Sequence, residues 1–286
     1  MFSASNILGC LLLSSGAFLH AATPPLRVCA DPNNLPYSNQ QKQGFENELA
    51  AMIARDFGTQ VSYLWYPQRE AFFRKTLNAG ACDIVMSVPE GFRDSATTQP
   101  YYRSTYVFVS RRDRHLNIRS LDDPRLPHLR IGVHVLGDSN SSLPPVQSLL
   151  SRGIVRNLVG YSIFGNLTEA NPPADLIEAV SRGDVDVAVA WGPMAGYFSR
   201  HSAVPLDITP IHGDPANPNL PFSFDIAIGV RKGNNALKDR LESELRRRKP
   251  EIRQVLRDYG IPQLDLSAAA SGGILICVPI SLLSRL

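Results

Sequence analysis

The chain has 286 residues, of which 44% are hydrophobic, enough to bury a core for one or two domains. Its net charge is only +3, with positive and negative residues intermixed. A nucleic-acid-binding protein concentrates positive charge on one face, so this pattern argues against a nucleic-acid partner. The clearest basic cluster, residues 246–249, lies near the end of a predicted helix, where the helix dipole favours cations. We interpret it as a solvated face.

The first 22 residues are typical of a secretory signal peptide. An apolar segment, 7–19, is followed by small residues, and we expect cleavage after Ala21 or Ala22. Cys10 suggests a lipoprotein cleavage site instead, but the apolar segment continues past it, which favours ordinary cleavage. No stretch reaches the roughly 18 apolar residues that a membrane span needs. The tail 267–286 is predicted to lie outside the fold.

The mature chain opens with alternating strands and helices. Strands are predicted at 26–30, 61–66 and 81–88, the last a continuous apolar run of the kind buried on both faces. Two helices separate them, one ending at Gly58 and one at Gly80. Their inward side chains are predicted to be Phe45, Leu49, Met52, Ile53 and Phe57 in the first helix, and Phe72, Phe73 and Leu77 in the second. This βαβαβ unit is the building block of a doubly wound sheet.

A second unit of the same kind begins at Leu129. Strands are predicted at 129–137, within 154–164 and at 184–191, and helices at 145–153 and 172–183. Leu26 matches Leu129 and Asp83 matches Asp186, in each case at an offset of 103 residues. The equal spacing predicts two similar lobes.

Two further strands, within 102–112 and 221–233, are predicted to cross between the lobes. Helices beginning at Asn235 and after Pro250 complete the chain. The predicted fold class is therefore α/β, with two doubly wound lobes joined by a two-strand hinge. The predicted boundaries are 24–108 plus 225–266 for lobe 1 and 109–224 for lobe 2.

The sequence carries none of the common catalytic or metal-binding motifs. It has no GxSxG, Walker A, GxGxxG or HExxH pattern, and its six histidines lack metal-ligand spacing. We therefore predict a protein that is not an enzyme and that has no cofactor and no metal site. A lone histidine such as His134 is expected to be an ordinary packed or surface residue.

Several segments resemble the periplasmic solute-binding proteins of ABC uptake systems, and more closely the quinoprotein-dehydrogenase-associated branch, the MoxJ/MxaJ and XoxJ proteins. The matching segments span nearly the whole mature chain and are LRVCADPNNLPYSN (26–39), GFENELA (44–50), WYPQREAFFRKTLNAGACDIVMSVP (65–89), TTQPYYRSTYVFV (97–109), GDVDVAVAWGPMAGYF (183–198) and PFSFDIAIGVRKG (221–233). The resemblance implies a periplasmic binding protein type II fold. It also implies a non-catalytic periplasmic accessory protein of a PQQ-dependent methanol or alcohol dehydrogenase. The expected partners are the dehydrogenase, its cytochrome c, or a small ligand bound in the interlobe cleft.

Two departures distinguish this chain from amino-acid receptors of the superfamily. Those receptors hold the ligand carboxylate with an Arg in a Ser/Thr-rich loop, whereas here the corresponding loop, 89–102, contains only Arg93, and its spacing differs. They also often present an acidic residue after a lobe-2 strand, where this chain has Trp191. Without both charged anchors, a free amino acid loses its charge-assisted hydrogen bonds.

The side chains expected to line the interlobe cleft follow the ends of the predicted strands. They are Asp31, Asn33, Asn34, Tyr37, Gln68, Arg69, Ser87, Pro89, Tyr101, Tyr102, Arg103, Trp191 and Gly192. Each has a simpler interpretation: the asparagines and Asp31 form turns, and the aromatic residues pack in the core. The same composition also suits a protein-docking surface.

Cys29 and Cys82 lie on predicted neighbouring strands, and two interpretations stand: a disulfide, or two buried thiols. For the whole protein, two alternatives to the accessory function also stand. One is a solute receptor of an ABC transporter, which a tight ligand with hinge closure would support. The other is a dehydratase-like enzyme on the same fold.

Overall fold

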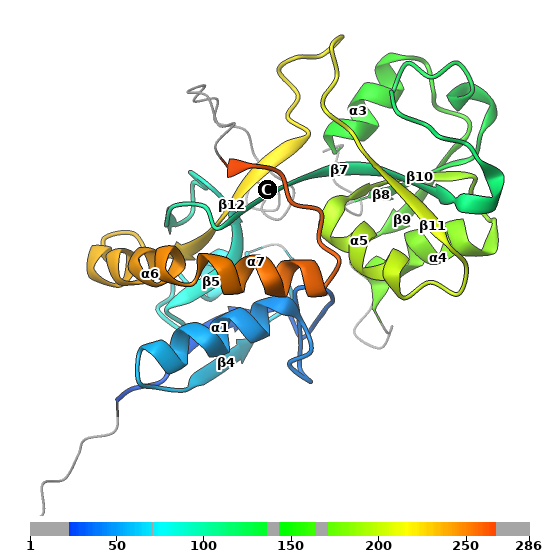
Figure 1. Ribbon diagram of the computed structural model, residues 1–286. Helices are drawn as coiled ribbons and strands as arrows, with labels where there is room; N and C mark the ends of the chain where they lie inside the picture. The colour runs from blue at the N-terminus through cyan, green and yellow to red at the C-terminus, as the bar shows by residue number, and fades with distance from the viewer. Residues whose placement is uncertain (1–22, 70, 136–142, 164–170, 267–286) are drawn as a thin grey trace, which may run out of the picture.

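The computed structural model describes residues 23–69, 71–135, 143–163 and 171–266 (Figure 1). Two groups of strands, each with its helices, are connected by the strands β7 (Tyr102–Arg111) and β12 (Ser223–Val230). The predicted signal peptide and C-terminal tail lie outside the described residues. The predicted α/β class with a two-strand hinge is confirmed, and the predicted lobe boundaries at 108/109 and 224/225 fall on these two strands.

The first group, which we call lobe 1, contains β1 (Leu26–Ala30), β2 (Asn33–Asn34), β3 (Ser38–Asn39), α1 (Phe45–Asp56), β4 (Val61–Trp65), α2 (Phe72–Lys75), β5 (Ile84–Pro89), β6 (Ala96–Thr97), α6 (Asn235–Arg247) and α7 (Lys249–Asp258). The second, lobe 2, contains η1 (Arg112–Arg114), η2 (Leu126–His128), β8 (Ile131–Val135), α3 (Pro144–Ser151), β9 (Leu158–Ser162), η3 (Pro172–Ala174), α4 (Asp175–Arg182), β10 (Val187–Trp191), α5 (Gly192–Arg200) and β11 (Leu206–Pro210).

One sheet runs through both lobes in the order β4-β1-β5-β12-β7-β10-β8-β9, with β6 paired to β12 and β11 paired to β7. The outer pairs within each lobe are parallel, and β7 is antiparallel to its neighbours on both sides. Residues 102–105 of β7 pair with β12, whereas residues 106–110 pair with β10. The change of partner between Thr105 and Tyr106 marks the hinge position on this strand.

The sequence repeat corresponds to the same backbone clamp in both lobes. The Arg27 amide donates to Asp83 Oδ2 at 2.9 Å, and the Arg130 amide donates to Asp186 Oδ2 at 2.8 Å. In both lobes the arginine guanidinium also donates to the aspartate and to the carbonyl of the glycine three residues before it. The shared pattern therefore reflects how the first strand of each lobe is tied to the turn that precedes its central strand.

Helix α1 follows the predicted amphipathic pattern, with Phe45, Leu49 and Ile53 almost fully buried. Its start is packed closely against the β2–β3 hairpin. A Cβ on Gly44 would collide with the carbonyl of Tyr37, so only glycine permits this approach. In Figure 1, α1 and α7 lie side by side on the same side of the lobe 1 sheet.

Two helix predictions need correction. The helix predicted before Gly80 is the single turn α2, because the backbone at Ala71 is left-handed (φ 62°), although Phe72, Phe73 and Leu77 are buried as expected. The chain does not break at Pro250 but between α6 and α7, and Pro250 lies in the first turn of α7, where a missing N–H costs nothing. Helix α5 and strand β11 were not predicted.

Candidate functional site

The loop after β1 is organised by Asp31, whose side chain is 8% exposed. Its carboxylate accepts from the amides of Gln68 at 2.6 Å and Asn33 at 2.8 Å. Burial raises the pKa of Asp31, and these hydrogen bonds and the charge of Arg69 oppose that rise. The Asn34 side chain donates to Gln68 Oε1 at 3.1 Å. The structure thus brings together the predicted residues of this loop.

A second carboxylate, Glu46 at the start of α1, is also buried and lies next to several predicted site residues. The Ser87 amide donates to Glu46 Oε1 at 3.2 Å, and the Ser87 hydroxyl lies 3.1 Å from the Tyr101 hydroxyl and 3.5 Å from that of Tyr102. Burial raises the pKa of Glu46 from 4.5 to about 7, while hydrogen bonds from Ser87 lower it and the nearby Asp31 raises it further. A glutamate with this pKa changes its charge near neutral pH.

Four buried tyrosines lie together beside this carboxylate, and three of them, Tyr37, Tyr101 and Tyr102, are close enough that the charge of Glu46 raises their pKa. We call them the tyrosine cluster: Tyr37, Tyr101, Tyr102 and Tyr106, each 3–6% exposed. Burial raises the pKa of every one of them well above the ordinary tyrosine range, so they stay neutral. The cluster is therefore an apolar packing unit with hydroxyl groups, not a source of charge.

Trp191, at the end of β10, packs against the tyrosine cluster from lobe 2. Its ring lies 5.3 Å from that of Tyr106 and 5.6 Å from that of Phe224, both edge-on. The Trp191 side chain also makes a hydrogen bond to the Tyr37 hydroxyl, and this bond partly offsets the rise in the pKa of Tyr37. At the next contact between the lobes, the Asn171 amide donates to Asn33 Oδ1 at 3.3 Å. Among the residues that the structure describes, these contacts between the lobes are made by aromatic rings and neutral amides.

Three predicted residues lie elsewhere. Arg103 follows Tyr102 and so points to the opposite face of β7, where it pairs with Asp225 at 3.2 Å. Pro89 ends β5 and is buried beside β12. Gly192 begins α5 so close to β7 that a Cβ would lie 2.6 Å from the Thr105 carbonyl oxygen, which makes it a packing residue.

A C-terminal strap, residues 259–264, ties α7 to α5 across the hinge. The Tyr259 ring stacks on Tyr197 at 5.9 Å, and the Ser104 hydroxyl donates to the Pro262 carbonyl at 2.7 Å. Gly196 of α5 packs so tightly against the carbonyl of Gly260 that a Cβ would collide with it. The strap therefore joins the two lobes along β7, where the backbone carbonyl of Arg103 also accepts from the Leu264 amide at 2.9 Å.

Within the described ranges, no group of three or more His, Cys, Asp or Glu residues is arranged to hold a metal ion. His134 is buried, and burial lowers its pKa to about 4. No helix in that part of the chain combines the length and apolarity needed to cross a membrane.

The comparison with family models matches residues 26–259 to the bacterial extracellular solute-binding proteins, family 3, and this covers both lobes. The protein belongs to this family. Type II periplasmic binding protein architecture, expected from the sequence resemblance, is thereby confirmed.

Three relatives show which family 3 proteins the chain is similar to. Protein MoxJ of Methylorubrum extorquens is 32% identical over 250 residues, covering 85% of this chain and 82% of its own length. The crystal structure of periplasmic binding protein XoxJ from Methylobacterium extorquens AM1 superposes with a TM-score of 0.69 and 33% identity, covering 84% of this chain and 99% of XoxJ. The structure of MxaJ from Methlophaga aminisulfidivorans MPT gives a TM-score of 0.71 and 29% identity, covering 84% and 100%.

In this family 3 protein, Glu46 is a site residue that was not predicted from the sequence. A signal was present, because Glu46 falls in register with the apolar residues Leu49 and Ile53 of α1. A charged residue in the inward register of an amphipathic helix is almost never fully buried without a specific partner. That partner, Ser87, is 41 residues away along the chain, and only the fold brings the two together.

We expect Glu46→Gln to remove the decrease in stability that the wild type shows as the pH rises from about 4.5 to about 7. Because the folded protein keeps the Glu46 proton up to about pH 7 whereas the unfolded chain loses it near pH 4.5, stability should fall as the pH rises through this window. The shift corresponds to an upper bound of about 3 kcal/mol. Glutamine keeps the acceptor for Ser87 and has no proton to lose. The free energy of unfolding, measured in urea at pH 4, 5, 6, 7 and 8, should therefore match the wild type at low pH and exceed it at pH 8.

Glu48→Gln is the matched control for this measurement. Glu48 lies on the same helix, two residues further on, and is exposed. Its replacement should leave the pH profile of stability unchanged. An unchanged profile in the Glu46 variant as well would show that another group carries the dependence.

Proposed function

We propose that this protein is a non-catalytic accessory protein of the periplasm that docks on a PQQ-dependent methanol or alcohol dehydrogenase and supports its maturation or activation. Its similarity to proteins named MoxJ, XoxJ and MxaJ supports this function. The sequence resemblance to the dehydrogenase-associated branch supplies the partner, with the cytochrome c of that system as a second candidate.

The observation that carries the proposal is the packing between the lobes. An amino-acid ligand needs a cation for its carboxylate and an anion for its ammonium group. Here Trp191, Tyr37, Tyr106 and Phe224 are packed around one another at this place. The carboxylate of Asp31 is occupied by backbone amides of its own lobe. This arrangement favours a protein that acts through its outer surface over one that captures a charged solute.

Three observations support export to the periplasm. The family is described as extracellular, and the first 22 residues are predicted to be a cleaved signal peptide. Cys29 and Cys82 form a disulfide, with 5.6 Å between their Cα atoms, and disulfides persist in oxidising compartments.

Calorimetric titration of residues 23–286 into the dehydrogenase from the same cell tests the proposal. We expect binding with a Kd of about 1 μM or tighter, which corresponds to about 8 kcal/mol of binding free energy. A parallel titration into the cytochrome c identifies which of the two is the partner. The absence of heat at two temperatures would overturn the accessory function, because two temperatures exclude an accidental zero enthalpy.

A solute receptor is the alternative, and membership of a solute-binding family favours it. A thermal-shift screen of amino acids, organic acids and alcohols distinguishes the two functions. A compound that raises the unfolding temperature and closes the hinge, together with no binding to the dehydrogenase, would establish the receptor.

A further inference from the structure

Three cations of α7 form a row on one side of the helix. Lys249, Arg253 and Arg257 follow each other at intervals of four residues, so their side chains lie one above the other. All three are exposed. None of them pairs with an aspartate or glutamate among the residues that the structure describes, and the Arg257 guanidinium donates only to the neutral Gln254 side chain. We call these three residues the cation row.

Neighbouring cations of the same helical region are neutralised. Arg247 and Arg248 both pair with Asp56 of α1, at 2.9 and 2.7 Å. Lys238 pairs with Glu242 at 2.8 Å. Arg248 also holds Glu251, the acidic residue in the first turn of α7. The cation row therefore lies next to cations that are already paired with acidic residues.

The helix dipole accounts for only one of the three residues of the row, Arg257. Residues 246–249 were predicted to be cations favoured at a helix end, and this holds for Arg246 and Arg247 in the last turn of α6. It is wrong for Lys249, which is the first residue of α7 and lies where the positive end of the dipole disfavours a cation. Arg253 lies in the helix interior, where the dipole gives it no advantage, and only Arg257, in the last turn of α7, is favoured by it. The row as a whole is thus not explained by stabilisation of its own helix.

We propose that the cation row is the surface of lobe 1 that docks on an acidic face of a partner protein, the dehydrogenase of the proposed function. This inference rests on that function and names the surface and the chemistry of the contact. Guanidinium groups bind carboxylates through two parallel hydrogen bonds, and unpaired charges attract an oppositely charged partner over the distance of a Debye length. Helix α7 lies on the outside of the lobe (Figure 1), so the row is open to a large partner.

A protein fits this surface better than a lipid membrane does. A membrane-binding helix combines cations with exposed large apolar side chains that enter the lipid. The described large hydrophobic residues that are exposed are Val135, Leu150, Val155 and Val159, all in lobe 2. The apolar residues of α7, in contrast, are buried against its own lobe. The cation row therefore offers charge without an insertion surface.

The test compares two variants that lose the same charge at different places. The first carries Lys249→Gln, Arg253→Gln and Arg257→Gln. The matched control carries Arg74→Gln, Lys75→Gln and Lys232→Gln, three exposed cations elsewhere on lobe 1 for which no acidic partner is found among the described residues. Far-ultraviolet circular dichroism and thermal unfolding establish that both variants fold like the wild type. Binding of each to the dehydrogenase is then measured by biolayer interferometry at 25, 75, 150 and 300 mM NaCl.

We expect the cation-row variant to bind about tenfold or more weakly at 25 mM NaCl, mostly through a slower association rate, with a flatter dependence on salt. The control should bind within about twofold of the wild type. Equal weakening of both variants would overturn the proposal, because net charge would then explain the effect. Unchanged binding of the cation-row variant would overturn it while leaving the proposed function intact.

Failure of the wild type itself to bind would overturn the proposed function and this inference with it. Sedimentation with vesicles of phosphatidylglycerol tests the remaining alternative, a lipid-binding surface. If the wild type binds these vesicles, the cation-row variant does not, and dehydrogenase binding is unchanged, the row is a lipid-binding surface and the proposal is wrong.

Discussion

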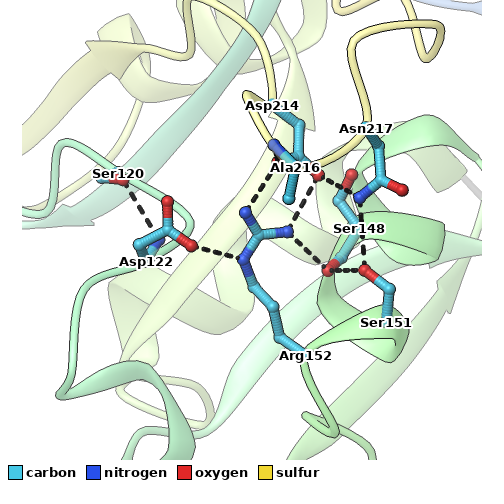
Figure 2. Close-up of polar contacts among 8 residues, drawn as sticks. All are labelled: Ser120, Asp122, Ser148, Ser151, Arg152, Asp214, Ala216 and Asn217. Carbon is cyan, nitrogen blue, oxygen red and sulfur yellow. Dashed lines mark hydrogen bonds and ion pairs between the residues drawn. The ribbon is translucent and has the colours of Figure 1, made fainter.

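Replacing Asp214 with alanine should lower the free energy of unfolding by about 3 kcal/mol, because it removes the bidentate partner of the mostly buried Arg152 and leaves it only the exposed Asp122 as an acidic partner. The Asp214 side chain is 0% exposed and that of Arg152 is 14% exposed. The guanidinium donates to both carboxylate oxygens, at 2.6 and 2.8 Å, and its Nε donates to Asp122 at 2.8 Å (Figure 2). The Ala216 amide and the Asn217 side chain complete the shell of donors around Asp214.

This ion pair matters because of the segments it joins. Arg152 follows α3, Asp122 belongs to the loop before η2, and Asp214 belongs to the chain that runs from β11 to the hinge strand β12. Loss of the pair should therefore loosen the path by which lobe 2 returns to lobe 1. Hydrogen bonds from Arg152 above all hold the pKa of Asp214 well below its usual range. Its contribution to stability should be complete above about pH 4 and lost as the pH falls further.

Urea unfolding monitored by circular dichroism measures the effect, and Asp207→Ala is the control. Asp207 pairs with Arg112 at 2.8 Å, but both side chains are exposed, at 40% and 62%. An exposed pair of this kind contributes less than about 1 kcal/mol. If Asp214→Ala cost no more than the control, the buried pair would not be holding the loop in place.

The strands and the long amphipathic helices were predictable because their signals are local. The apolar runs of β5 and β10 and the spacing of Phe45, Leu49 and Ile53 in α1 each lie within a dozen residues. The repeat was visible for the same reason, since each lobe uses the same arginine and aspartate to tie its first strand to the following turn. The side chains predicted to face inward in the first helix are buried in the structure.

Elements whose form depends on distant contacts were not predictable. Helix α5 begins GPMAG, a sequence with poor helix propensity, and it forms where Gly196 allows the strap to pass at Gly260. The helix before Gly80 was predicted too long. Its aromatic residues Phe72 and Phe73 are buried around the Cys29–Cys82 bridge instead of along a regular helix.

The site residues likewise fall into those with a local sequence signal and those whose environment depends on distant contacts. Loop residues that follow strand ends, such as Asp31 and Gln68, were placed together because the carboxyl ends of parallel strands meet at one edge. Arg103 was grouped with them by sequence proximity, although strand alternation directs it to the opposite face from Tyr102. Glu46 acquires its environment from Ser87 and the tyrosine cluster, which no local pattern contains.

Removing the disulfide with Cys29→Ala and Cys82→Ala should lower the free energy of unfolding by about 4 kcal/mol, according to the chain-entropy relation for a loop of this length. The two cysteines are 53 residues apart in sequence and both are 1% exposed. The bridge connects β1 to the turn before β5, so it closes a loop that contains the strands β2, β3 and β4 and the helices α1 and α2. Without it the unfolded chain gains freedom, whereas the folded core keeps nearly the same side-chain volume.

The reduced wild type distinguishes the bridge from its alternative, two buried thiols. Under dithiothreitol, the urea midpoint of the wild type should fall to that of the double alanine variant, and the variant itself should not respond to the reductant. A wild type with the same midpoint with and without dithiothreitol would mean that the two cysteines contribute only as packed side chains. Because β1 also carries Arg27, the residue clamped to Asp83, the loss should concentrate in lobe 1. Hydrogen exchange would therefore show faster opening of β1 and β5 than of β8 and β10, which the equivalent clamp of lobe 2 holds without a disulfide.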